Sequence, residues 1–160
     1  NDRDAIRSDI GAYFIVMERF DAARDALMVL EATAATELYR LNARANMVIL
    51  GARAGDKEIF ETWRSRIDDS AFTPEARVNY LIESARGLRV FGDFDAAVGL
   101  LEEARALATE HGFNRSIFEA DEMLAERTVV GTTSGGVRYE GSDAAASVEQ
   151  ELRKMALAVA

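Results

Sequence analysis

Apolar residues recur along this chain in helical stripes that follow short polar turns. After the first and third of these turns, apolar side chains stand at successive spacings of three, four and three residues. These spacings place the side chains on one face of an α-helix. The turns begin 37 positions apart and read "ERFDAA", "GDKEIF" and "GDFDAA". The pattern predicts an all-α chain built from a repeated antiparallel helical hairpin of about 37 residues.

The Gly-Asp pairs predict where helices end and begin. Gly55 and Gly92 can adopt the left-handed conformation that ends a helix, and Asp56 and Asp93 can cap the N–H groups of the next helix. In the middle copy Lys57 interrupts the apolar stripe, and we expect nearby apolar bulk to compensate for it. Each turn therefore predicts a tight antiparallel hairpin.

Further turn signals divide the chain into four predicted hairpins within a single domain, 1–160. Thr73 before Pro74 predicts an N-cap, Gly112 predicts a helix end, and Asn114 and Ser142 predict caps of two later helices. The predicted hairpins span residues 2–34, 37–69, 73–110 and 114–160.

The fourth predicted hairpin departs from the 37-residue interval. It contains an insertion over residues 128–141, whose valine pairs and Thr/Ser/Gly centre predict a small β-hairpin or an ordered loop. Two interpretations of residues 143–160 stay open. They form either the last helix of a fourth hairpin or an unrelated capping helix.

The phrase "GDFDAAVGLLEEARAL" resembles the turn and second helix of a tetratricopeptide repeat. The third copy matches the family pattern with small Ala85 in its first helix and Phe94 after the turn, whereas the middle copy has Val48 and Phe60 at positions that are usually small. The resemblance covers residues 1–110 clearly and implies a right-handed array of hairpins. The period of 37 exceeds the family's usual 34. We therefore expect a tetratricopeptide-like array with somewhat longer helices.

In arrays of this family the first helix of each hairpin lines a concave face that binds peptides. Asparagine offers one acceptor and two donors to an extended backbone, and arginine can bind a carboxylate through two hydrogen bonds. The residues of this kind that we predict to contact a partner are Asn42, Asn46, Arg53, Asn79, Arg86 and Arg89. The lysine-rich carboxylate clamp of some family members is not matched here. The alternative is that these side chains are solvated or cap neighbouring backbone.

Composition argues against several other functions. The net charge of −9 disfavours a nucleic-acid surface, which requires a basic patch. With no cysteine and with His111 as the only histidine, one chain cannot assemble a metal site rich in nitrogen or sulfur ligands. The segment "GTTSGG" lacks the Lys-Ser or Lys-Thr of a phosphate-binding loop. We expect no cofactor and no enzymatic activity, and the enzymatic alternative is a carboxylate-based metal site.

The sequence therefore predicts a non-enzymatic scaffold that binds a protein or an extended peptide. Helical-repeat domains of this kind often follow a helix-turn-helix domain in bacterial regulators, which suggests a sensor or oligomerisation role. A different alternative is a structural homodimer built on the C-terminal helix. We expect a cytoplasmic protein without a membrane partner, since no apolar run approaches the roughly 20 residues of a spanning helix.

Overall fold

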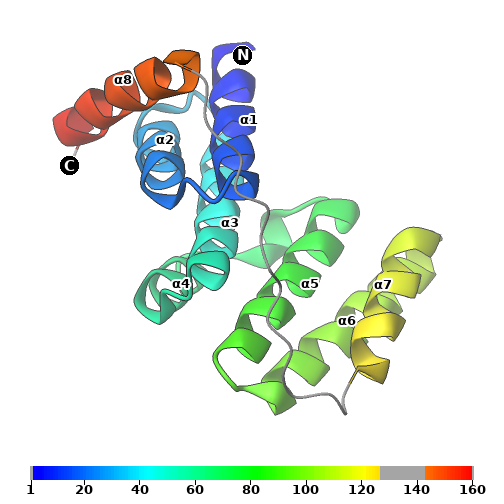
Figure 1. Cartoon of the computed structure of the whole chain (residues 1–160). Helices are drawn as coiled ribbons and strands as arrows, with labels where there is room; N and C mark the ends of the chain where they lie inside the picture. The colour runs from blue at the N-terminus through cyan, green and yellow to red at the C-terminus, as the bar shows by residue number, and fades with distance from the viewer. Residues whose placement is uncertain (1, 127–142, 160) are drawn as a thin grey trace. The chain divides into compact units, whose positions relative to one another are not determined.

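The computed structural model describes residues 2–126 and 143–159, and the regular structure of these residues is entirely helical (Figure 1). Within these ranges there are eight α-helices, one short 3-10 helix and no strand. The predicted all-α class is confirmed. The predicted insertion over 128–141 and the Ser142 cap lie outside the described residues. None of the helices in the described ranges has both the length and the apolar character needed to cross a membrane.

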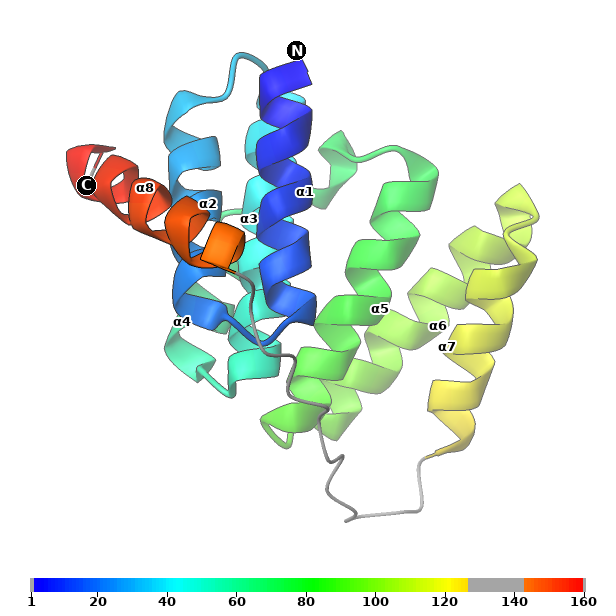
Figure 2. The ribbon, with the colours of Figure 1, turned by 45° about the horizontal axis from the view of Figure 1, so that its top comes forward.

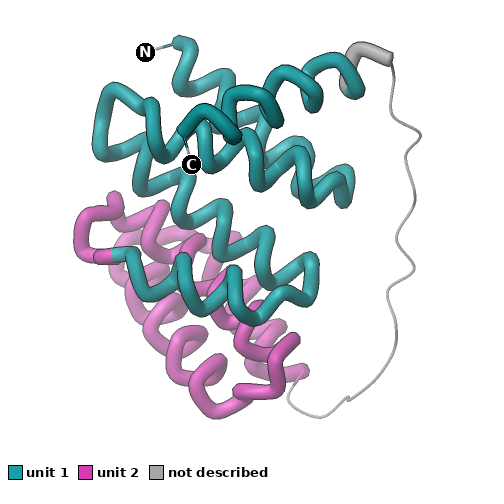
Figure 3. Tube along the Cα trace, turned by 90° about the vertical axis from the view of Figure 1, so that its left-hand side faces the viewer, with its two compact units in different colours: residues 1–67, 136–160 teal, residues 68–135 magenta. Residues whose placement is uncertain are grey.

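The chain divides into two compact units (Figure 3). Unit 1 comprises residues 1–67 and 136–160, and unit 2 comprises residues 68–135. The helices of unit 1 are α1 (Asp2–Val16), α2 (Phe20–Thr33), α3 (Glu37–Ala54), α4 (Lys57–Arg64) and α8 (Asp143–Val159). The helices of unit 2 are the 3-10 helix η1 (Asp69–Ala71), α5 (Pro74–Val90), α6 (Phe94–His111) and α7 (Asn114–Ala125).

One backbone turn recurs three times at the 37-residue interval. Gly55 and Gly92 have φ angles of 69° and 82°, so the predicted left-handed helix ends are confirmed. Glu18 occupies the equivalent position in the first turn and adopts φ 57° although it is not glycine. After each of these residues, the next N–H donates to a carbonyl five residues earlier at 2.9 Å. The donor and acceptor pairs are Arg19 with Phe14, Asp56 with Gly51, and Asp93 with Leu88.

Side-chain caps start three of the helices as predicted. Asp56 Oδ1 accepts a hydrogen bond from the Ile59 N–H at 2.9 Å, and Asp93 Oδ1 accepts one from the Ala96 N–H at 3.3 Å. Thr73 Oγ1 accepts from the Ala76 N–H at 3.4 Å. These bonds satisfy N–H groups that have no partner inside the helix, and so they fix the starts of α4, α6 and α5.

The predicted Asn114 cap is wrong by one residue. Gly112 ends α6 in the left-handed conformation with φ 73°, as expected. The next N–H, that of Phe113, then donates to the Ala108 carbonyl at 2.8 Å, so Phe113 takes the N-cap position without a side-chain cap bond. Asn114 is consequently the first residue of α7.

Close contacts at two glycines join the two helices of each hairpin in unit 1. A Cβ atom added at Gly11 would lie 2.6 Å from Leu27 Cδ2, and one added at Gly51 would lie 2.5 Å from the Phe60 backbone nitrogen. Helix α1 therefore packs closely on α2, and α3 packs closely on α4. The space at Gly51 also explains how Phe60 can be fully buried at a position where the repeat pattern has a small residue.

Unit 1 is completed by α8, which packs against α2 and contributes Leu152 to the buried core (Figure 2). The core side chains of the unit are Phe14, Ile15, Ala22, Ala23, Ala26, Leu27, Leu30, Ala34, Ala43, Met47, Leu50 and Leu152.

In unit 2, α6 packs against both α5 and α7. Small side chains at the buried positions of α6 allow this close packing on two neighbours, and three of its four buried residues are alanines. These buried residues are Ala97, Leu101, Ala104 and Ala108. Helices α5 and α7 are thereby brought side by side, with few direct contacts between their backbones.

Candidate functional site

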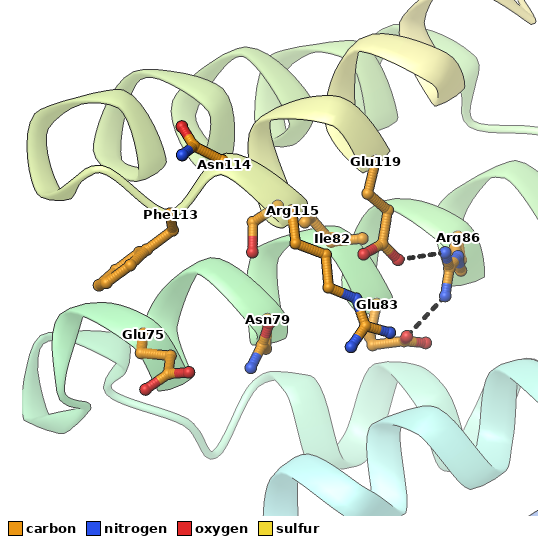
Figure 4. A pocket seen from close by; sticks show the side chains of 10 residues that line it. Glu75, Asn79, Ile82, Glu83, Arg86, Phe113, Asn114, Arg115 and Glu119 are labelled. Carbon is orange, nitrogen blue, oxygen red and sulfur yellow. Dashed lines mark hydrogen bonds and ion pairs between the residues drawn. The ribbon is translucent and has the colours of Figure 1, made fainter.

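A groove of about 500 Å³ lies between α5 and the start of α7 in unit 2 (Figure 4). Its floor is formed by Ile82, which is almost fully buried. The other lining residues carry three carboxylates, two guanidinium groups, two amides, one hydroxyl and one aromatic ring. They are Glu75, Asn79, Glu83, Arg86, Phe113, Asn114, Arg115, Ser116 and Glu119.

The contacts between α5 and α7 explain where the groove opens. Arg86 of α5 binds Glu119 of α7, and Arg89 of α5 binds the end of α7 at Met123 and Glu126. The order of these contacts shows that the two helices run in the same direction. The arginine contacts hold the C-terminal part of α5 against α7, and the groove extends from Arg86 toward the N-terminal ends of both helices, where Glu75 lies.

Two of the predicted site residues, Arg86 and Arg89, already have partners within unit 2. Arg86 binds Glu83 at 2.7 Å and Glu119 at 2.5 Å, so its charge is shared between two carboxylates. Arg89 donates to the carbonyl oxygens of Met123 at 3.1 Å and Glu126 at 3.3 Å. These carbonyls belong to the last turn of α7, where a cation is favourable. Arg86 and Arg89 therefore position α7 and thereby shape the groove.

Asn79, the third predicted site residue in this unit, is free to bind a partner. Its side chain is exposed and points into the groove, as does that of Arg115 from the opposite helix (Figure 4). Neither side chain makes a hydrogen bond or an ion pair with any part of the chain that the structure describes. The ring of Phe113 forms part of the wall and stacks on His111, with ring centroids 5.6 Å apart.

The remaining predicted site residues, Asn42, Asn46 and Arg53, lie on one face of α3 in unit 1. The two asparagines are half-buried and Arg53 is exposed. Among residues 2–126 and 143–159, none of the three has a side-chain hydrogen bond or ion pair. The structure thus places the six predicted residues in two groups, one on α3 of unit 1 and one on α5 of unit 2.

Sequence reasoning missed the groove residues that α7 contributes, chiefly Phe113, Arg115 and Glu119. They follow Asn79 by more than 30 positions. The repeat pattern aligns the first helix of each hairpin with the other first helices, and it does not indicate which residues of α7 lie opposite Asn79. One signal was nevertheless present. Arg115 stands in the first turn of α7, which has no acidic residue, although a cation there is disfavoured by the helix dipole. A cation at such a position is a reason to look for an anionic partner.

The polar side chains of the groove can recognise a ligand. No group of three or more His, Cys, Asp or Glu side chains in the described residues could hold a metal ion. The guanidinium of Arg115 can bind a carboxylate, and the amide of Asn79 can pair with a peptide group.

Comparison with known proteins gives no further guide to function. No family model, no curated protein and no solved structure matches this chain.

Proposed function

We propose that this chain is a non-enzymatic binding protein whose groove between α5 and α7 takes a short peptide segment that carries a carboxylate. The observation that carries the proposal is the pair formed by Asn79 and Arg115. These two polar side chains point into one groove from opposite helices, and the described residues give neither of them a partner.

The charges of the groove favour a carboxylate at Arg115. Glu83 and Glu119 already compensate Arg86, so Arg115 is the cation available to a ligand. The N-terminal end of α7 adds a favourable electrostatic contribution for an anion beside Arg115. A carboxylate bound there would relieve the unfavourable interaction of Arg115 with the helix dipole.

The peptide backbone would lie along the groove between these polar groups. The Asn79 amide can donate to a backbone carbonyl and accept from a backbone N–H, which suits an extended segment. Ile82 and the ring of Phe113 provide an apolar floor and wall for one side chain of the peptide. Glu75, at the same end of α5, would disfavour a second acidic residue in the ligand.

The test is a selection of decapeptides from a random phage-displayed library on the full chain, followed by fluorescence anisotropy with the selected peptides. We expect Arg115→Ala and Asn79→Ala each to weaken binding about 10- to 100-fold, which corresponds to a charge-assisted or a buried hydrogen bond. Replacing the acidic residue of the peptide by its amide should weaken binding to the parent chain and have little further effect on Arg115→Ala.

Arg153→Ala is the matched control, because Arg153 is an exposed arginine on α8 of unit 1. It should leave the affinity unchanged. If selected peptides bind with equal affinity to the parent chain, to Arg115→Ala and to Asn79→Ala, the groove is not the binding site. Asn42→Ala, measured in parallel, reports whether the peptide also contacts α3.

A further inference from the structure

Helix α8 is attached to unit 1 through α2, and it packs on α2 as extensively as α7 packs on α6. Leu152 and Ala156 are its buried apolar residues, and each is 6 % exposed. Other apolar side chains of α8 remain open to solvent, with Leu157 at 76 % exposure. In the sequence α8 follows unit 2, but in space it belongs to unit 1 (Figure 3). The helix is therefore a separate element that the chain returns to the first hairpin.

An ion pair between Arg19 and Glu149 fixes the register of α8 on this surface. Arg19 Nη2 donates to Glu149 Oε2 at 2.6 Å, and both side chains are partly buried. Removing one partner from such a pair leaves the other charge in a poorly solvated place. The docking of α8 thus depends on charge complementarity as well as on Leu152 and Ala156.

Arg19 stands at the second position of the repeated turn, and its role there differs from that of the equivalent residues in the other two turns. The equivalent residues in the next two turns are Asp56 and Asp93, whose carboxylates cap α4 and α6. Arg19 leaves the start of α2 without a side-chain cap and directs its guanidinium to α8 instead. The first turn contributes a docking residue where the others contribute a cap.

We propose that the α2 surface around Arg19 is a helix-binding site, and that its second occupant is α8 of another copy of this chain. The second copy presents the same Glu149, Leu152 and Ala156 at the same spacing, so exchange reproduces every contact without requiring a new surface. Each copy supplies one site and one helix, and reciprocal exchange therefore closes at a dimer. The intramolecular α8 has the higher effective concentration, so the exchanged dimer forms as the protein concentration rises.

Charge reversal separates exchange from intramolecular docking. In Arg19→Glu, two carboxylates face each other at the docking site, and in Glu149→Arg, two guanidinium groups do. Neither variant can dock its own α8. When the two variants are mixed, each docking site can be matched only by the α8 of the other variant. We expect native mass spectrometry of an equimolar mixture to show a heterodimer that neither variant forms alone.

The double variant Arg19→Glu/Glu149→Arg is the control for folding, because it restores opposite charges within one chain. It should behave as the parent chain does. Hydrogen exchange provides a second measurement for a dimer that dissociates during analysis. The amides of α8 should exchange faster in each single variant and become protected again in the mixture.

The proposal is overturned if the mixture contains only monomers and its α8 amides exchange as fast as in the separate variants. It is also overturned if α8 stays protected in both single variants, since the Arg19–Glu149 contact would then not govern docking. In the first case α8 is a purely intramolecular helix.

Discussion

Helices α7 and α8 are both added to a hairpin, but they are held in different ways. Three arginines bind α7, and they come from both of its neighbours. Arg86 and Arg89 belong to α5, and Arg105 belongs to α6. Among the side chains that the structure describes, one ion pair reaches α8 from this part of the unit, and it comes from Arg19 at the start of α2. The difference is that arginines from two neighbouring helices bind α7, whereas α8 combines one ion pair with the apolar packing of Leu152 and Ala156.

The way α7 is held also produces the groove. Because arginines of α5 bind the middle and the end of α7, its first turn is positioned beside the N-terminal half of α5 without being closed onto it. A preorganised groove requires a rigid α7. The conformational entropy of α7 is then lost when the protein folds, so that fixing this helix does not weaken ligand binding.

The largest expected effect is the loss of apolar packing beneath α7. Met123 is 8 % exposed, and we expect Met123→Ala to lower the free energy of unfolding of unit 2 by about 2–4 kcal/mol, because the substitution leaves a cavity. Chemical denaturation measures the stability, and hydrogen exchange locates the change. The exchange of α8 should be unaffected, since α8 belongs to unit 1.

Phe118→Ala is the control on the same helix. Phe118 is 70 % exposed, so its truncation should change stability by less than about 0.5 kcal/mol. Equal effects of the two substitutions would contradict the view that α7 is fixed through a buried face.

A smaller effect is expected when the arginine of α5 that binds the C-terminal end of α7 is removed. Arg89→Ala leaves the Met123 and Glu126 carbonyls without this donor and should lower the stability of unit 2 by about 1–2 kcal/mol. The last turn of α7 should show faster hydrogen exchange. Arg105→Ala, which removes an exposed ion pair with Asp121, should cost less than about 1 kcal/mol. If Arg105→Ala were the more damaging of the two, the ion pair with Asp121 would contribute more to the stability of α7 than the hydrogen bonds from Arg89.

The smallest effect concerns an exposed arginine contact in unit 1. A hydrogen bond from Arg40 lowers the pKa of Glu37 below its ordinary value of 4.5, and the charge of Arg44 acts in the same direction. A carboxyl whose pKa is lowered by folding stabilises the protein above its ordinary pKa, and this contribution disappears as the pH falls through the folded value. We therefore expect Glu37→Gln to lower Tm slightly at pH 7, and this effect to disappear once the pH has fallen below the folded pKa of Glu37. Glu102→Gln, which removes a carboxylate from an exposed face of α6, is measured in parallel as the control.

The helix boundaries near each turn could be predicted because the residues that set them are adjacent in the chain. Gly55, Gly92 and Gly112 end helices, and Asp56 and Asp93 cap the next ones, as their side chains and conformational preferences indicate. The failure at Asn114 has a local cause of the same kind. The residue after a left-handed helix end takes the N-cap position in this turn, and that rule selects Phe113 over an asparagine with a better capping side chain.

The candidate site could be predicted only in part, because it is formed by two helices. The repeat register identified Asn79 on α5, but it contained no information about which residues of α7 would face it. It likewise could not show that Arg86 and Arg89 would find partners more than 30 residues away. Whether an arginine is free or paired depends on the packing of separate helices.

The sequence by itself determined the all-α class, the repeated turn and most helix ends, since these depend on backbone conformation and capping within a few residues. The tertiary structure decided that Arg115 joins Asn79 in one groove and that Arg19 binds Glu149 across 130 positions. Both results depend on which helix faces bury their apolar residues together. Burial brings distant side chains within reach, and no local preference specifies it.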